Sequence, residues 1–290
     1  MKTQNLETIK KWLTEADAIV ITAGAGMGVD SGLADYRGQD GGQWGKVETE
    51  TEKTVFETVN PAAFLNDPVY SWSLFGKRME EYENTTPHQG FDILKKWIQK
   101  FDLDYFIITS NIDSHFQKAG FEEEKIRELH GSLAYFQSSN NNLSDKIWKT
   151  ELTGKNIQLG VLDNRFPMCP DSKVMARPNV YMFRDDTFVN TRTKAQEKNF
   201  QSFLERNNKK NIIVFEIGSG PHVQAVRMKT RFLRSNYAAK VVRINPKDFK
   251  IKLIHLPLIF KELILLKKSL ELSRALKIQN KQKFHLSQNQ

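Results

Sequence analysis

The stretch AIVITAGAGMGVDSGLADYRG, residues 18–38, decides the fold of this chain. Its first five residues form a nearly continuous apolar run, which is typical of a strand buried inside a parallel sheet. They lead into a turn with glycine at positions 24, 26 and 28. Because glycine has no Cβ, such a turn lets backbone N–H groups approach a phosphate, and a following helix adds its positive end. This order predicts the start of a nucleotide-binding α/β unit.

The same turn also has a plainer interpretation. Glycine turns serve as tight connections between a strand and a helix, and Val29 stands where a G-x-G-x-x-G motif has its last glycine. Beyond the turn, Asp35 and Arg37 lie on a segment that could fold back over a ligand. The Arg37 guanidinium could neutralise a pyrophosphate or pair with a surface acid. The turn alone leaves both interpretations open.

Further apolar runs predict more strands of the same sheet, at residues 105–109, 180–183, 212–217 and 240–244. Helical periodicity is found at residues 5–16, 91–99 and 194–206. Strands that alternate with helices predict crossover connections. The expected fold class is α/β, with a Rossmann-like parallel sheet that carries helices on both faces and a small inserted module.

Two segments interrupt this alternation. Residues 39–84 are rich in Thr, Glu and aromatic residues, which suggests short helices that cover the ligand cleft. Residues 131–176 are polar and irregular and are interpreted as a small separate module. The Rossmann-like domain is therefore expected to comprise residues 1–130 and 177–257. A C-terminal helix and a disordered basic tail are expected over residues 258–290.

The composition of this 290-residue chain fits a folded protein with a sizeable core, because 39% of its residues are hydrophobic. Of the formal net charge of +9, residues 251–290 supply +6, from eight basic and two acidic residues. Such a tail could contact nucleic acid, an acidic partner or anionic lipid, but a solvated face is favoured, and neither nucleic-acid nor membrane binding is predicted. Cys169 is the only cysteine, and residues 1–11 lack the apolar core of a signal peptide. The protein is therefore expected to be intracellular, in the cytoplasm or the nucleus.

Polar side chains follow the predicted strand at residues 105–109. Asn111 and Asp113 lie at its carboxyl end, where open α/β sheets bind ligands. Their alternate spacing lets an amide and a carboxylate face one ligand, although Asn and Asp also favour plain turns. His130, which precedes Gly131, is a candidate base, although a single His is more often a hydrogen-bonded structural residue.

Taken in order, these motifs resemble those of the sirtuins, the NAD-dependent protein deacylases. Sirtuins typically carry a stretch like G-A-G-x-S-x-x-S-G-I-P-D-F-R, then T-Q-N-I-D, then an H-G pair. The chain resembles these at residues 24–37, 109–113 and 130–131. Later matches lie at residues 119–120, 177–180, 183, 217–219 and 244–246, and the likeness covers roughly residues 5–257. So many matches in order favour the functional interpretation of Asn111, Asp113 and His130.

The resemblance implies that NAD binds as a co-substrate. Gly24, Ala25 and Gly26 would hold its pyrophosphate, with Arg37 near the phosphates and ribose. Asn111 and Asp113 would shape the pocket for nicotinamide, while Ser219 and Asn245 would contact the adenosine half. The other expected NAD contacts are Asp35, Tyr36, Ser110, Ile112 and Gly218, and the expected contacts of the substrate are Val180, Met182 and Phe183.

The resemblance also implies a reaction on acyl-lysine proteins or peptides, with His130, Asn111 and Asp113 as the catalytic residues. The acyl oxygen of the modified lysine attacks C1′ of the nicotinamide ribose as nicotinamide leaves. His130, as general base, draws a proton from the ribose, and the 2′ oxygen attacks the bound acyl carbon. Water then releases free lysine and O-acyl-ADP-ribose. Such a base usually contributes about 10²–10⁴-fold in rate.

The chain departs from the family most clearly in the inserted module. Sirtuins usually bind a structural zinc there through two Cys-x-x-Cys pairs, whereas here Cys169 stands alone and Ser172 takes the fourth position. A closed zinc site needs four ligands, mostly Cys or His, and residues 131–176 contain no His. No metal site is therefore predicted. Apolar packing is expected to hold the module instead, through Leu133, Tyr135, Phe136, Trp148 and Phe166.

Smaller departures lie near the expected active site, where Gly28, Ala34, Ser110 and Arg184 replace Ser, Pro, Gln and Gly. Arg184 could alter the peptide preference, favour acidic acyl groups or point to solvent. The leading hypothesis is an NAD-dependent protein-lysine deacylase. The alternatives are an NAD glycohydrolase or ADP-ribosyltransferase of the same fold, and a module that only binds NAD or ADP-ribose. A pure binding module has no need of a base, so the presence of His130 argues against it.

Overall fold

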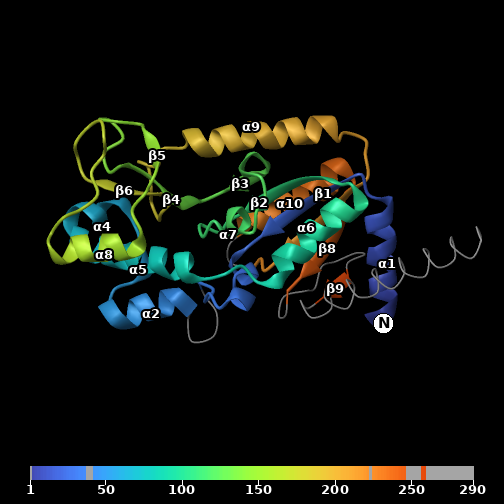
Figure 1. Cartoon of the computed structure of the whole chain (residues 1–290), viewed down its shortest axis with the longest axis horizontal. Coiled ribbons are helices and arrows are strands. Elements are labelled where there is room, and N and C mark those ends of the chain that lie inside the picture. Colours follow the sequence, from blue (N-terminus) through green and yellow to red (C-terminus); the bar gives the residue numbers. More distant parts are fainter. Residues whose placement is uncertain (1, 37–41, 222–223, 246–255, 259–290) are drawn as a thin grey trace, which may run out of the picture.

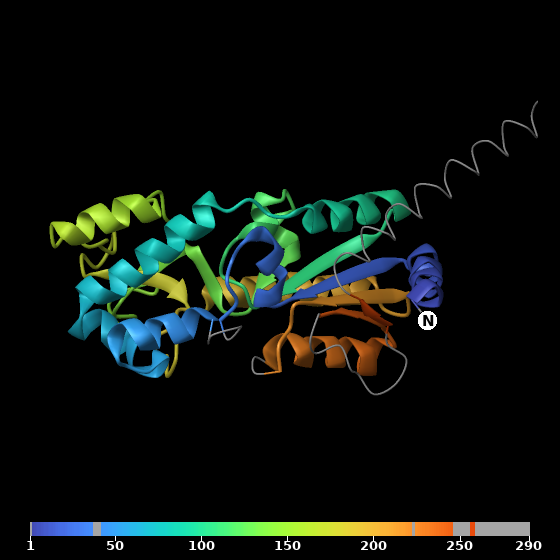
Figure 2. The ribbon, with the colours of Figure 1, turned by 90° about the horizontal axis from the view of Figure 1, so that it is seen from below.

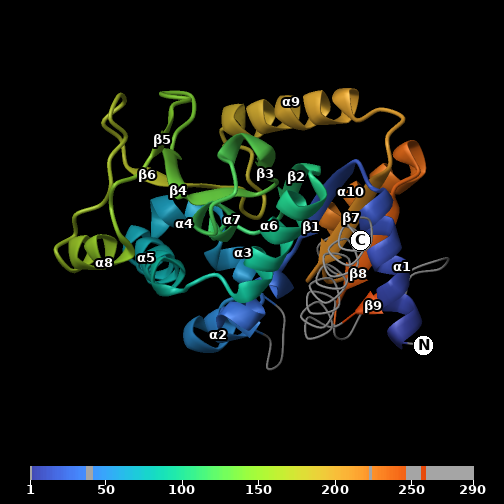
Figure 3. The same cartoon turned by 45° about the vertical axis from the view of Figure 1, so that its right-hand side comes forward.

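The structure is a computed structural model that describes residues 2–36, 42–221, 224–245 and 256–258. Its elements form two parts, each built around one sheet (Figure 1). The parallel sheet lies toward the right of Figure 1, and the smaller antiparallel sheet lies toward the left with α4, α5 and α8. Figure 3 shows the same division after a 45° turn.

The larger part contains a six-stranded parallel sheet with the strand order β3-β2-β1-β7-β8-β9. In the middle, β1 (Ala18–Ala23) pairs with β2 (Asp104–Thr109) on one side and with β7 (Ile212–Ile217) on the other. The remaining strands are β3 (Ile126–Glu128), β8 (Lys240–Ile244) and β9 (Leu256–Leu258). The carboxyl ends of β1, β2 and β7 meet at one edge of the sheet, where open α/β sheets bind ligands.

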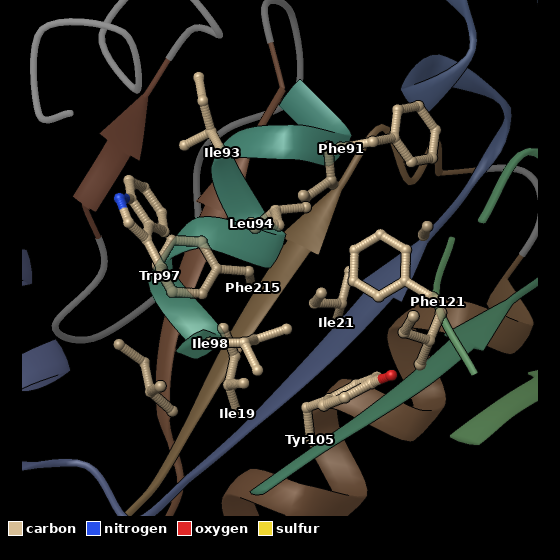
Figure 4. Close-up of a cluster of buried hydrophobic side chains, with 14 of the residues drawn as sticks. Ile19, Ile21, Phe91, Ile93, Leu94, Trp97, Ile98, Tyr105, Phe121 and Phe215 are labelled. Carbon is tan, nitrogen blue, oxygen red and sulfur yellow. The ribbon is translucent and has the colours of Figure 1, made fainter. Parts of the chain in front are cut away.

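Helices cover both faces of this sheet because its central strands are apolar on both sides. Ile19 and Ile21 point to one face and pack against α1 (Lys2–Glu15) and α6 (Gln89–Phe101), and Figure 4 shows the contact with α6. Val20 points to the other face and packs with residues of α9 (Thr191–Arg206) and α10 (Gln224–Tyr237). Figure 2 shows the strands of the sheet between α6 and α10, as the Rossmann-like prediction requires.

The smaller part contains a three-stranded antiparallel sheet in the order β5-β4-β6. Its strands are β4 (Gly131–Ser138), β5 (Ile147–Lys149) and β6 (Ala176–Val180), and its helix α8 (Gly154–Leu162) packs on α5 (Pro68–Asn84). The other helices of the segment before it are α2 (Gly42–Thr51), α3 (Val55–Thr58) and α4 (Pro61–Asn66).

One apolar core joins this module to α4 and α5. Phe64 and Trp72, from these two helices, pack with Phe136 of β4, and Leu133 is buried in the same cluster. Trp148 and Phe166 pack against it as partly buried residues. Tyr135 differs from the expectation, because its hydroxyl donates a hydrogen bond of 2.6 Å to Glu123 outside this core.

The sequence-based boundaries hold closely for β7 and β8 and within a few residues for β1, β2, α1, α6 and α9. The predicted strand at residues 180–183 is wrong. The strand there is β6, which ends at Val180 and pairs antiparallel with β4 in the second sheet. After Val180 the chain bends away, because the Phe183 N–H donates to Val59 O instead of to a strand. The strands β3, β4, β5 and β9 were not predicted. Leu258, the first residue of the expected C-terminal helix, lies in β9, and the rest of that helix and the tail lie outside the described residues.

Among the residues that the structure describes, no helix combines the length and the apolar character needed to cross a bilayer.

Candidate functional site

A pocket opens at the carboxyl ends of β1 and β2. It is partly open to solvent. Its walls come from the glycine-rich turn, from the Asn-Ile-Asp motif and from one residue of α5. The lining residues are Ala25, Leu33, Ala34, Tyr36, Tyr82, Asn111, Ile112 and Asp113.

The turn after β1 is shaped by contact with a second glycine turn, after β7. A Cβ atom on Gly24 would lie 2.7 Å from Gly218 O, and one on Gly26 would lie 2.7 Å from Gly218 Cα. The N–H of Gly24 donates to Ile217 O at 2.9 Å, and that of Gly26 donates to Gly218 O at 3.1 Å. Glycine is therefore required here for the approach of two backbone turns, in addition to the expected approach of a phosphate.

Asn111 is fixed in the pocket wall by both motifs. Its N–H donates to Thr109 Oγ1 at 3.0 Å, and its Nδ2 donates to Gly24 O at 3.1 Å. The residue is only 6% exposed, and its Oδ1 has no hydrogen-bond partner among the described residues. A buried acceptor without a partner is destabilising by about 1–3 kcal/mol. This oxygen could therefore accept a hydrogen bond from an N–H or O–H group of a ligand.

Asp113 brings a carboxyl group to the same pocket. Its Oδ1 accepts a hydrogen bond of 2.9 Å from the N–H of His115, the first residue of α7 (His115–Lys118). Burial raises the pKa of Asp113 from 3.8 to about 6, although the bond from His115 and the charge of Lys118 act in the opposite direction. The carboxyl group is therefore ionised at pH 7 but takes up a proton in mild acid.

His130 lies in the connection between β3 and β4, next to the end of β2. The residue before Asn111, Ser110, is fixed to β1, because its N–H donates to Ala23 O at 3.0 Å. Burial lowers the pKa of His130 below its usual 6.5, although the nearby backbone of Ser110 opposes this. The ring is therefore neutral at pH 7, which is the form that can accept a proton. Gly131 follows with φ +76°, where a Cβ atom would lie 2.0 Å from Asn179 O.

The predicted substrate contacts lie at the end of β6 and just after it, and this segment is bonded to the backbone of His130. The Tyr181 N–H, between Val180 and Met182, donates to the His130 carbonyl at 2.9 Å. The side chains of Val180 and Met182 are buried in the core of the smaller part, so they anchor this segment. The ring of Phe183 is half-buried, and its centre lies 5.4 Å from that of Trp44 on α2.

The residues predicted for the adenosine half lie at the carboxyl ends of β7 and β8. Gly218 takes φ +63°, which lets the turn pack on the one after β1. The Ser219 hydroxyl donates to Glu216 at 2.6 Å, and Asn245 Nδ2 donates to Ser219 O at 3.0 Å. Glu216 is fully buried and forms an ion pair with Arg243. This buried pair was not predicted, although two charged residues inside apolar strands were a visible signal.

Tyr82, an aromatic residue of the segment expected to cover the cleft, lines the pocket although it was not predicted as a site residue, and Leu33 was not predicted either. The Tyr82 hydroxyl lies 3.2 Å from that of Tyr36, and Arg78 lies 5.7 Å from the centre of each ring. Burial raises the pKa of both tyrosines, so their hydroxyls are protonated at neutral pH. The four-residue spacing of Arg78 and Tyr82 on α5, which places them on one helix face, was the available signal.

The structure thus brings together Ala25, Tyr36, Ile112 and the two polar residues of the second motif, with His130 beside them. Asp35 lies half-buried on the segment before the pocket residue Tyr36. Arg37 lies outside the described residues, so its predicted contact stays a prediction.

The module does not offer a ligand set that fits a structural zinc. Cys169 is buried, and its N–H and carbonyl close a tight turn with Val174 and Lys173. Among the described residues, which include all of 131–176, no cluster of His, Cys, Asp and Glu could hold a metal ion. The apolar core shared with α4 and α5 supplies packing where a zinc would cross-link the module. The zinc-free state stays a prediction.

Comparisons with known proteins agree with this geometry. The chain matches the model of the Sir2 family over residues 24–224. It is 27% identical over 237 residues to an NAD-dependent protein deacylase of Aquifex aeolicus, which covers 80% of this chain and 85% of the relative. It is 25% identical to a "Probable bifunctional ADP-ribose hydrolase/ADP-ribosyltransferase" of Fusarium oxysporum f. sp. cubense, over 83% of this chain and 42% of that protein.

Solved structures show the same fold. A Sir2 homologue mutant in complex with ADP-ribose superposes with a TM-score of 0.69 at 21% identity, over 92% of this chain and 98% of that one. A Sir2 homologue in complex with NAD gives a TM-score of 0.68 at 20% identity, over 91% and 94% of the two chains. With the family match spanning most of its length and this fold, the chain belongs to the Sir2 family.

Proposed function

We propose that this protein is an NAD-dependent protein-lysine deacylase, which releases nicotinamide and O-acyl-ADP-ribose. The single observation that carries the proposal is the pocket between the glycine turn and the Asn-Ile-Asp motif, with the neutral ring of His130 beside it. The names of related family members, several of which are NAD-dependent deacylases or deacetylases, support it. We infer that it acts on acylated proteins or peptides inside the cell.

Two groups of described residues support the proposal that NAD binds here. At one end, the partnerless Oδ1 of Asn111 is an acceptor for the carboxamide N–H of nicotinamide, and Asp113 lies on the same wall. At the other end, Ser219 and Asn245, which are joined by the bond from Asn245 Nδ2 to Ser219 O, would contact the adenosine ribose. The contact between the turns of Gly24 and Gly218 connects the two ends, and a pyrophosphate there would meet Ala25. NAD would therefore extend along the carboxyl edge of the sheet.

In this reaction NAD supplies the ribose carbon that accepts the acyl oxygen when nicotinamide leaves. Asn111 and Asp113 would hold the nicotinamide end in the pocket. His130 then takes a proton from the ribose, so that its oxygen can attack the acyl carbon. Because burial lowers the pKa of His130, the ring starts in the neutral form required of a base.

The second candidate function is NAD cleavage without deacylation, as a glycohydrolase or ADP-ribosyltransferase. The match to the Fusarium oxysporum protein favours keeping this alternative. In that case nicotinamide release would need no acyl-lysine. The two functions therefore differ in a measurable requirement.

One assay separates them. Purified protein is incubated with NAD, with and without an acetyl-lysine peptide, and nicotinamide and O-acetyl-ADP-ribose are measured. Deacylation requires release of both products only when peptide is present, whereas release of nicotinamide alone without peptide supports the second function. His130→Ala should lower O-acetyl-ADP-ribose formation by roughly 10²–10⁴-fold and leave NAD affinity nearly unchanged. Equal activity in this variant would exclude His130 as the base.

A further inference from the structure

Glu128 is a buried carboxylate that lies two residues before His130, at the end of β3. It is 1% exposed, and no step of the proposed reaction uses it. Its Oε1 accepts a hydrogen bond of 3.1 Å from Gln117 Nε2, on α7. Its Oε2 accepts from Arg192 and, at 3.4 Å, from Gln196, both on α9. One carboxylate therefore joins three elements, β3, α7 and α9.

The backbone of the same residue is also fixed. The Glu128 N–H donates to Gln196 Oε1 at 3.0 Å, so that Gln196 holds both the main chain and the side chain. In Figures 1 and 3, α9 lies along β3, in agreement with these contacts. The Leu129 N–H then donates to Thr109 O at 2.8 Å, which ties the next residue to the end of β2.

Arg192 balances the buried charge. Its guanidinium also donates to Glu123 at 3.1 Å and lies 4.0 Å from the centre of the Tyr135 ring. Burial raises the pKa of Glu128, but the charge of Arg192 acts against this. Removing one partner of such a buried ion pair destabilises the fold, because the charge of the other partner remains buried without compensation.

These contacts link the two motifs of the site. The helix that carries Gln117 starts at His115, whose N–H donates to the Asp113 carboxylate. The Glu128 carboxylate thus connects the segment that carries Asp113 to the segment that carries His130. These two segments are held relative to each other by a few hydrogen bonds. A change at Glu128 would therefore displace His130 relative to the pocket wall that carries Asp113.

We propose that Glu128 is a positioning residue, which sets the place of the His130 ring relative to the ribose bound over the Asn-Ile-Asp motif. This inference rests on the proposed deacylase function. A base that is misplaced by about 1 Å can lose on the order of 10²-fold in rate. The first step, in which the acyl oxygen displaces nicotinamide, requires no base and is expected to tolerate the displacement.

The test compares two readouts in Glu128→Gln. Three donors converge on the carboxylate, and a glutamine side chain offers only one acceptor oxygen, so the variant loses part of the connection. We expect O-acetyl-ADP-ribose formation to fall by about 10–100-fold. Exchange of labelled nicotinamide into NAD, measured with acetyl-lysine peptide present, and the KM for NAD should stay within about 3-fold.

Glu123→Gln is the matched control. It removes a carboxylate from the same Arg192, but the Glu123 side chain is 43% exposed, compared with 1% for Glu128. We expect both reactions to be unchanged in this variant, because an ion pair exposed to solvent contributes little. Gln117→Leu is the second test variant if Glu128→Gln does not fold, and it should lower product formation in the same direction by a smaller factor.

The outcomes are distinguishable. If wild-type protein shows neither peptide-dependent product nor exchange, the proposed function fails. If wild-type protein is active and His130→Ala is not, but Glu128→Gln and Gln117→Leu both keep full product formation, the positioning role is wrong. An equal loss of product and exchange in a folded variant would also overturn it, because that pattern indicates a general structural role. A selective loss of product formation supports the proposal.

Discussion

Replacing Asp113 with Asn should stabilise the folded protein at pH 8, although it removes a carboxylate from the candidate site. Burial raises the pKa of this group from 3.8 to about 6, so the fold disfavours its ionised form. At about 1.4 kcal/mol for each pKa unit, a rise of about 2 corresponds to roughly 3 kcal/mol. Because the side chain keeps some contact with solvent, we expect a gain on the order of 1–3 kcal/mol.

The pH dependence has a definite sign. Between pH 3.8 and about 6 the folded state binds the proton more tightly than the unfolded state. The wild-type unfolding free energy therefore carries the full penalty above pH 6 and loses it as the pH falls through this window. Asn is neutral at every pH, and its Oδ1 can still accept the hydrogen bond from His115. The advantage of Asp113→Asn should thus be largest at pH 8 and vanish near pH 4.

Urea unfolding of wild type and variant at pH 4, 6 and 8 measures this difference. Asp145→Asn is the control, because Asp145 is an exposed aspartate on the smaller part and its replacement should change little. Deacylation by Asp113→Asn should fall, since the site keeps its shape but loses the charge. Equal stability of wild type and Asp113→Asn at pH 8, or an advantage that grows toward acid, would refute the reasoning.

Three further predictions follow from burial, backbone geometry and ligand chemistry. Burial lowers the pKa of His115 from 6.5 to about 4, so its contribution to wild-type stability is complete above pH 6.5 and is lost as the pH falls toward 4. In urea unfolding, the free energy of unfolding of His115→Leu should therefore rise by about 2 kcal/mol relative to that of wild type when the pH is lowered from 7.5 to 5. Gly218→Ala should cost more than about 3 kcal/mol in thermal unfolding, because its φ is +63° and its Cβ atom would lie 2.2 Å from Met27 N, whereas Gly220→Ala, with nothing within 4 Å, should change stability by less than about 0.5 kcal/mol. Metal analysis of the purified protein should find no stoichiometric zinc, since one Cys and no His are present in residues 131–176, and one bound equivalent would contradict this.

The candidate site was predictable where a chemically suitable side chain directly follows an apolar strand in the sequence. Asn111 and Asp113 follow an apolar strand directly, and parallel strands place such positions at one edge of the sheet. Tyr82 could not be assigned in this way. It enters the pocket from α5, and its place depends on how that helix packs against α8 and the smaller sheet. Glu128 likewise gains its meaning from Gln117 and Arg192, which lie 11 and 64 positions away in the chain.

By itself, the sequence determined the parallel sheet, its glycine turn and the family, because apolar runs and short motifs are local patterns that each record one physical requirement. Only the tertiary structure decided that residues 176–180 pair with β4 in a second sheet, since antiparallel pairing depends on a distant partner. The same holds for the two glycine turns, which touch at Gly24 and Gly218 although 194 positions separate them. Contacts between distant residues are set by the packing of whole elements, and no short stretch of sequence contains that information.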